Sequence, residues 1–159
     1  MDSEVKLYIE RSQNELVLAK AVLNLSQNKD KKTSFGIPED YTFYSAVISH
    51  SYYCIFYTAK ALLLTKGVKT DFPEVHKKTL EEFKTNFVDT GELDVELLKI
   101  YKKAVIRADE LLGLFQTEKR KRGQFTYQKL PQANLEPAEE SVNNASNFFK
   151  NINKICDQK

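Results

Sequence analysis

The chain has 159 residues, a length that suits one domain with a substantial core. Hydrophobic residues make up 42% and charged residues 29%, which is typical of a soluble globular protein and excludes a disordered one. The net charge of +2 excludes the strong positive field of a dedicated nucleic-acid binder, so any phosphate site must be a local patch. Glycine numbers 5 and proline 4, so we expect long regular elements.

The spacing of apolar residues predicts a first helix from about Ser3 to Gln27, followed by a solvated loop over residues 28–38. Asp40 is the expected cap of a second helix, Tyr41 to Lys66. Apolar residues cover more than half of the circumference of this second helix. The pattern indicates a helix that is central in the bundle or covered on its second side by a partner.

A third helix is expected to open at residues 71–73 and to end at residues 89–91. The fourth starts near Leu93 and is expected to run to the basic group at residues 119–123. Gly113 lies in its predicted interior, where glycine costs about 1 kcal/mol relative to alanine. We therefore expect a weak point or a close helix crossing there.

Residues 124–133 are expected to be irregular, and Asn134 to cap a fifth helix that ends near Cys156. The prediction is a single all-α domain over residues 1–159, an up-and-down bundle of about five helices. A basic loop that carries aromatic residues precedes its last helix.

The two cysteines, Cys54 and Cys156, lie far apart in apolar helical stretches, and we interpret them as buried thiols in a reducing cytosol. The residues imply no metal and no cofactor, because neither cysteine has a histidine at ligand spacing. Residues 1–10 lack the apolar core of a signal peptide, and the apolar stretch at residues 52–64 is too short to span a bilayer. We expect a cytoplasmic protein without a membrane partner.

The run SHSYYCIFYTAKALLL at residues 49–64, followed by Gly67, resembles the signature second helix of the HEPN family (higher eukaryotes and prokaryotes nucleotide-binding). The HKK run at residues 76–78, the GEL run at 91–93 and the NLEPAEES run at 134–141 match its small stand-alone archaeal and bacterial branch. The resemblance implies a helical bundle that forms a homodimer. It also implies a small nucleotidyltransferase as partner, since many family members are encoded with one as a toxin–antitoxin pair.

Active members of this family are metal-independent ribonucleases built around an arginine followed four to six residues later by a histidine. Two copies of that motif meet at one cleft in the dimer. Here the matching position is Arg122, and Tyr127 follows it in place of the histidine. An alternative alignment places the family arginine at Arg107. No histidine follows either arginine at the required spacing.

This departure from the motif bears on catalysis. Cleavage by the neighbouring 2′-hydroxyl needs a base, an acid and positive charge at the phosphate. Arginine supplies the charge through its planar fork, and histidine, with a pKa of about 6.5, supplies the acid or base. Tyr127 can donate a proton or a hydrogen bond, but a tyrosine with a pKa of about 10 is a poor base. The sequence therefore favours a reduced or inactive catalytic site.

Each candidate residue also has a structural interpretation. The basic group at residues 119–122 could complement the negative end of the fourth helix, and Tyr127 could be a core aromatic of the loop. His50 fits a satisfied interior or interface histidine, and His76 an exposed structural residue near a helix start. The tyrosines and phenylalanine at residues 52–57 fit core plus dimer surface, or a platform for stacking bases.

Our leading hypothesis is an interaction module that binds RNA or nucleotide as a homodimer and forms a complex with a nucleotidyltransferase. Tyr127 would then be a candidate acceptor of transferred nucleotide. The alternative is a weak metal-independent endoribonuclease toxin that uses Arg122 with Tyr127 or His50. The candidate residues for binding RNA or nucleotide are Lys119, Arg120, Lys121, Arg122, Arg107 and His50.

Overall fold

The computed structural model describes residues 1–115 and 134–159. Every regular element in these two ranges is helical, which confirms the predicted all-α class. The elements are α1 (Ser3–Gln27), α2 (Lys29–Ser34), α3 (Tyr44–Leu64), α4 (Val75–Phe83), the π-helix η1 (Lys84–Val88), α5 (Val95–Leu112) and α7 (Leu135–Asp157).

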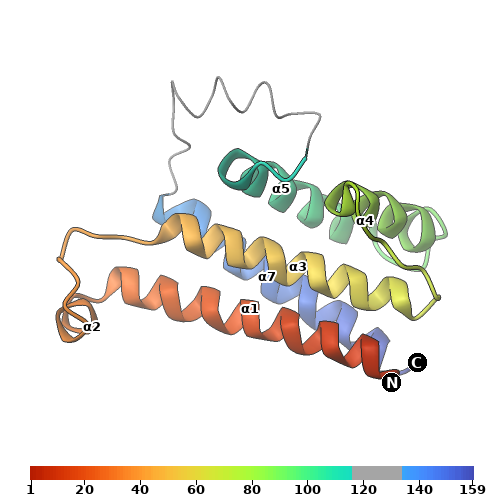
Figure 1. The fold of residues 1–159 in the computed structure, drawn as a ribbon, viewed down its shortest axis with the longest axis horizontal. Helices are drawn as coiled ribbons and strands as arrows, with labels where there is room; N and C mark the ends of the chain where they lie inside the picture. The colour runs from red at the N-terminus through yellow and green to blue at the C-terminus, as the bar shows by residue number, and fades with distance from the viewer. Residues whose placement is uncertain (116–133) are drawn as a thin grey trace.

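The long helices α1, α3, α5 and α7 alternate in direction along the chain, as an up-and-down bundle requires (Figure 1). Helix α3 packs against α1, α4, α5 and α7, and is therefore the centre of the bundle. Helices α4 and α5 lie on the side of α3 that is away from α1 (Figure 1).

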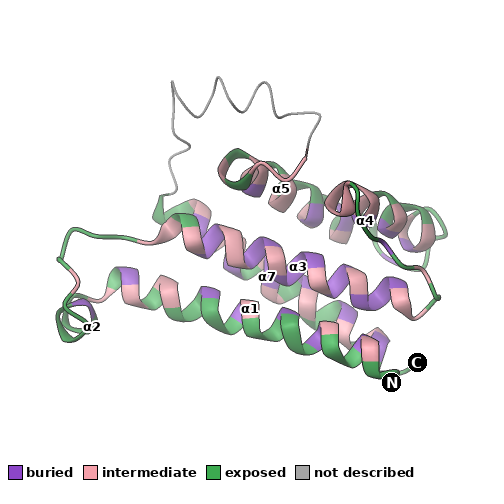
Figure 2. Cartoon of the chain, in the orientation of Figure 1, coloured by how far each residue is buried: buried purple, intermediate pink, exposed green. Residues whose placement is uncertain are grey.

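The position of α3 explains its apolar composition. Buried residues recur along its whole length and outnumber those of every other helix in the described ranges (Figure 2). Its fully buried members include Val47, Tyr52, Cys54, Ile55, Ala59, Leu62 and Leu63. Because four neighbouring helices cover α3, its wide apolar surface does not by itself require a partner chain.

The starts of α1 and α5 follow ordinary capping chemistry. The carboxylate of Asp2 accepts a hydrogen bond from the backbone N–H of Glu4 at 2.8 Å, and Asp94 accepts one from Glu96 at 2.8 Å. Helix α5 ends at Leu112, because Gly113 adopts the left-handed conformation with φ of 64°. The prediction that Gly113 lies inside a longer helix was wrong, since it is the C-cap.

The predicted loop over residues 28–38 was wrong in part, because it contains the short helix α2. The side chain of Asn28 accepts a hydrogen bond from the backbone N–H of Lys31 at 2.9 Å and so caps this helix. Lys32 is buried, and its Nζ donates to the carbonyl of Glu39 at 2.9 Å. This bond gives the ammonium a protein partner and links α2 to the turn before α3.

Helix α3 begins at Tyr44 and not at Tyr41, and Asp40 does not cap it. Its N-cap is Phe43, whose own side chain makes no capping bond. The backbone N–H of Phe43 donates instead to Ser26 Oγ on α1 at 2.9 Å. A long-range contact between two helices therefore fixes a boundary that local sequence signals placed three residues too early.

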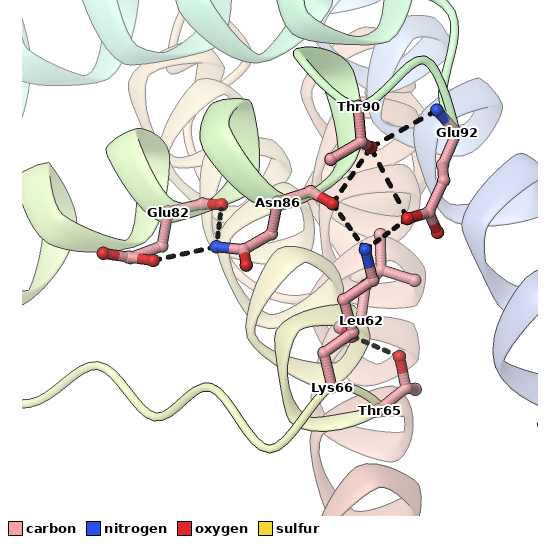
Figure 3. A network of polar contacts seen from close by, with 7 residues as sticks. All are labelled: Leu62, Thr65, Lys66, Glu82, Asn86, Thr90 and Glu92. Carbon is pink, nitrogen blue, oxygen red and sulfur yellow. Dashed lines mark hydrogen bonds and ion pairs between the residues drawn. The ribbon is translucent and has the colours of Figure 1, made fainter.

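The end of α3 is bound to the segment that follows α4 (Figure 3). Lys66 Nζ donates to the carbonyl of Asn86 at 2.6 Å and to the carboxylate of Glu92. The same ammonium lies 4.3 Å from the centre of the Phe87 ring. These contacts hold η1 against the bundle, and Phe87 of η1 and Phe83 at the end of α4 are both buried.

Helix α7 runs from Leu135 to Asp157, close to the predicted bounds, and Asn134 is its N-cap residue, although its side chain makes no capping bond. Inward-facing residues of α7 include Val142, Phe148 and Ile152. Among the described helices, none combines the length and the hydropathy that crossing a membrane would need.

Candidate functional site

The structure describes two of the predicted site residues, Arg107 on α5 and His50 on α3. The others lie outside the described residues: Lys119, Arg120, Lys121, Arg122 and Tyr127. Arg107 and His50 share no hydrogen-bond partner, because Arg107 contacts α7 and His50 contacts α1.

The guanidinium of Arg107 joins α5 to the first turns of α7. Its Nη1 donates to the carbonyl of Pro137 at 2.9 Å, and its Nη2 donates to Glu140 Oε2 at 2.8 Å. Lys103, one turn earlier on α5, pairs with the same carboxylate. The hydrogen bond from Lys103, together with Arg107, lowers the pKa of Glu140 below its ordinary value. Glu140 therefore stays ionised at neutral pH and forms ion pairs with both Lys103 and Arg107.

A small pocket lies beside Arg107, between α3, α5 and α7. Its lining is mixed, with the polar side chains of Ser51, Lys103, Arg107, Ser141 and Asn144 beside Ile48, Tyr52 and Ala104. Ser141 Oγ donates to the carbonyl of Pro137 at 2.8 Å, the same oxygen that Arg107 binds. Ser51 Oγ is buried and has no hydrogen-bond partner among the described residues.

His50 is held by a carboxylate of the neighbouring helix. Its Nδ1 lies 2.6 Å from Glu15 Oε2 on α1, and both side chains are about one-quarter to one-third exposed, at 31% and 24%. This contact agrees with the interpretation of His50 as a satisfied histidine. The ring nitrogen that faces Glu15 is not available to a substrate while the contact holds.

His76 is more buried than the sequence suggested, because it packs in the first turn of α4 against α3. Its Nδ1 lies 2.8 Å from the hydroxyl of Tyr52, and its ring centre lies 4.3 Å from that of Phe56. Burial, with a smaller effect of the Lys60 charge, lowers the pKa of His76 to about 4. Burial also raises the pKa of Tyr52, so at neutral pH a neutral phenol lies against a neutral imidazole.

That arrangement restricts the chemistry of His76. Its Nδ1 is engaged by the Tyr52 hydroxyl, which can donate to it or accept from it, so Nε2 is the ring nitrogen outside this contact. A group whose pKa is about 4 is mostly unprotonated at pH 7 and is a weak base. Sequence reasoning missed this pair, since Tyr52 and His76 lie on different helices and no local pattern connects them.

The aromatic cluster of α3 divides into two groups. Tyr52 and Phe56 are buried in the core, whereas Tyr53 and Tyr57 stay partly exposed. The first group supports the core interpretation of this cluster. The second group leaves aromatic surface on the side of α3 that faces α1, where Tyr57 stacks on Tyr8.

Metal-ligating residues do not cluster in the described ranges: no three histidine, cysteine, aspartate or glutamate side chains are placed to hold an ion together. Cys54 and Cys156 are both free and buried. Burial raises the pKa of the Cys54 thiol to about 12 and that of Cys156 to about 11, so neither is a reactive thiolate at neutral pH.

Comparison with known proteins agrees with this helical bundle. The family model described as HEPN domain matches residues 39–155, from the turn before α3 almost to the end of α7. A protein of Methanocaldococcus jannaschii that is named a putative toxin is 44% identical over 62 residues. That match covers 39% of this chain and 40% of the archaeal protein, so the two are similar over less than half of their lengths. Because the family model covers most of the chain, this protein belongs to the HEPN domain family.

Proposed function

We propose that this chain is an RNA- or nucleotide-binding HEPN module that acts as a homodimer beside a small nucleotidyltransferase, in a pair of the toxin–antitoxin kind. The observation that carries the proposal is family membership over residues 39–155, together with a relative that is named a putative toxin. On this proposal residues 1–159 are one domain, and the protein works in the cytoplasm.

The contacts of Arg107 support Arg122 as the phosphate-binding arginine. Arg107 donates hydrogen bonds to Pro137 and Glu140. A phosphate that binds Arg107 would therefore have to compete with the carboxylate of Glu140. Arg122 lies in the basic group formed with Lys119, Arg120 and Lys121. We assign phosphate binding to this group, and we assign Tyr127 as the acceptor of nucleotide from the partner enzyme.

The alternative function is a weak metal-independent endoribonuclease that uses Arg122 with Tyr127 or His50. The chain has only two histidines, and the contacts of both disfavour this alternative. His50 Nδ1 faces Glu15, His76 Nδ1 lies against the Tyr52 hydroxyl, and the pKa of His76 is about 4. His76 is therefore a weak base at neutral pH, and Nδ1 of His50 is already engaged by Glu15, so the non-catalytic module is the better-supported proposal.

The direct test is the affinity of the purified protein for labelled single-stranded RNA and for nucleoside triphosphates. We expect wild type to bind RNA, and Arg122→Ala to bind more weakly with a smaller salt dependence. Lys99→Ala is the matched control, since Lys99 is an exposed cation on α5 that pairs only with Glu96 among the described residues. Absence of binding to RNA and to nucleotides would refute the binding function.

Two further measurements separate the remaining parts of the proposal. Sedimentation equilibrium should give a dimer, and a monomer at micromolar concentration would contradict the homodimer. Overexpression of wild type beside Arg122→Ala tests the alternative. Growth inhibition that Arg122→Ala relieves would favour the endoribonuclease, whereas a harmless wild type would remove most of its support.

A further inference from the structure

We propose that the partly exposed tyrosines Tyr8, Tyr53 and Tyr57, with the cations of Arg11 and Lys60 beside them, form a platform on which bases of single-stranded RNA stack. We call these five residues the tyrosine platform. The inference rests on the proposed function, because it names a surface through which the bound RNA would make contact.

The three rings of the platform form a continuous stack across two helices. Tyr53 and Tyr57 are one turn apart on α3, with ring centres 6.1 Å apart and planes inclined by 29°. Tyr57 and Tyr8 of α1 have centres 6.0 Å apart and planes inclined by 27°. A nucleobase can extend such a stack, because every base offers a flat π-surface whatever its sequence.

The three rings pack against the core but are less buried than their neighbours in it. On the same helix Tyr52 is fully buried and Phe56 is 5% exposed, whereas Tyr53 and Tyr57 remain partly exposed, as does Tyr8 on α1. His76 of α4 packs on Tyr52 and Phe56, and it also meets Tyr53 at a ring-centre distance of 6.0 Å. Because the platform tyrosines are only partly buried, each keeps some aromatic surface in contact with solvent.

Positive charge accompanies the aromatic surface. The guanidinium carbon of Arg11 lies 5.9 Å from the ring centre of Tyr8 and 5.8 Å from that of Tyr57. The Nζ of Lys60 lies 5.0 Å from the centre of Tyr8 and is fixed by a 3.0 Å bond to the carbonyl of Thr70. These cations lie over the tyrosine rings, and aromatic rings combined with cations are the arrangement that binds bases and phosphates of a single strand together.

The ion pairs nearby leave this charge available. Arg11 pairs with no carboxylate among the described residues, and Glu15, one turn further along α1, is engaged by His50. A two-fold contact between copies through this surface would bring Arg11 and Lys60 toward the same cations of the second copy. Charge complementarity therefore favours a polyanion over a second copy of the chain as the occupant.

The test is fluorescence anisotropy of a labelled single-stranded RNA of about 12 nucleotides, a length within the usual range of such sites. Tyr57→Ala removes one stacking ring, so its affinity for the RNA should be about 5- to 100-fold lower than that of wild type. Tyr57→Phe keeps the ring and should bind within about twofold of wild type. The matched control is Tyr41→Ala, since Tyr41 is also an exposed tyrosine but lies outside the platform.

Arg11→Ala tests whether the positive charge of the platform contributes to RNA binding. The substitution leaves core packing intact, because Arg11 is exposed. It should reduce the slope of log affinity against log salt by about 0.7, the value for one phosphate contact on a single strand. Circular dichroism confirms that each variant is folded. If Tyr57→Ala fails to fold, the comparison of Arg11→Ala with the control Lys99→Ala decides the proposal.

The possible failures are distinguishable. If wild type binds RNA and both Tyr57→Ala and Arg11→Ala bind equally well, the platform is wrong while the proposed function stands. If wild type does not bind RNA, the proposed function fails and the platform fails with it. If wild type is a dimer and Tyr57→Ala is a monomer, the surface is a contact between subunits and the inference is overturned.

Discussion

Arg107 on α5 donates a hydrogen bond from Nη2 to Glu140 Oε2 on α7, at 2.8 Å. The same guanidinium binds the carbonyl of Pro137, and Lys103 adds a second cation to Glu140. These bonds connect the last turns of α5 to the first turns of α7, the two helices that flank residues 116–133. Arg107 therefore has a structural role that accounts for its contacts without a ligand.

Removal of this arginine should affect stability and not RNA binding. Arg107→Ala should lower the free energy of unfolding by about 1 kcal/mol, because the lost bonds are charge-assisted but only partly buried. Urea unfolding measures this change, with Lys99→Ala as a control that should alter stability by less than about 0.5 kcal/mol. Loss of RNA affinity in Arg107→Ala at unchanged stability would contradict the structural role.

Removal of the hydroxyl should change the stability of the fold in opposite directions at two buried tyrosines, Tyr101 and Tyr52. Tyr101 is fully buried, and its hydroxyl has no partner among the described residues, so Tyr101→Phe should stabilise the fold by about 1 kcal/mol. Tyr52 is equally buried but bonds His76, so Tyr52→Phe should destabilise it by about 1 kcal/mol. Thermal unfolding of both variants checks the pair, and the same sign for both would refute the assigned contacts.

The stability of the fold should depend on the titration of His76. Its pKa is about 4 in the folded chain and 6.5 in the unfolded chain, so between these values the unfolded state binds more protons. Stability should therefore fall as the pH drops from 6.5 toward 4. In His76→Gln, which keeps an acceptor for Tyr52, the decline should be shallower. Identical slopes for wild type and variant in thermal melts across this range would contradict the burial of His76.

Glu74 should be replaceable with a gain in stability. It adopts a left-handed backbone with φ of 56° at the start of α4, and its side chain makes no capping bond. Asparagine tolerates this conformation better, so Glu74→Asn should stabilise the fold by about 0.5 kcal/mol. Glu96→Asn in the first turn of α5 is the control and should not stabilise. Chemical denaturation measures both, and a destabilised Glu74→Asn would show that the glutamate has a role of its own.

The all-α class and the four long helices, α1, α3, α5 and α7, could be predicted from apolar spacing, because burial of one face leaves a clear period in the sequence. Helix boundaries that depend on contacts between distant residues could not be predicted in this way. Phe43 bonds to Ser26, and this contact places the start of α3. Gly113 was predicted inside a helix because the apolar pattern continues past it, yet its left-handed conformation ends α5 there.

The candidate site was less predictable than the fold. Composition and motif spacing identify residues that could bind phosphate, but they do not show which cations are already paired. The bond of Arg107 to Glu140 joins residues 33 positions apart, and that of Tyr52 to His76 joins residues 24 apart. The tyrosine platform likewise needs α1 beside α3, because Tyr8 lies far from Tyr57 in the sequence.

The most direct test of the central claim, that the chain binds RNA without cutting it, is incubation of the purified protein with total RNA in the presence of a chelator. Wild type and Arg122→Ala are compared by gel for complex formation and for cleavage. The account predicts intact RNA in both samples and a complex that is weaker with Arg122→Ala. Cleavage by wild type that is lost in Arg122→Ala would contradict it and establish a metal-independent ribonuclease.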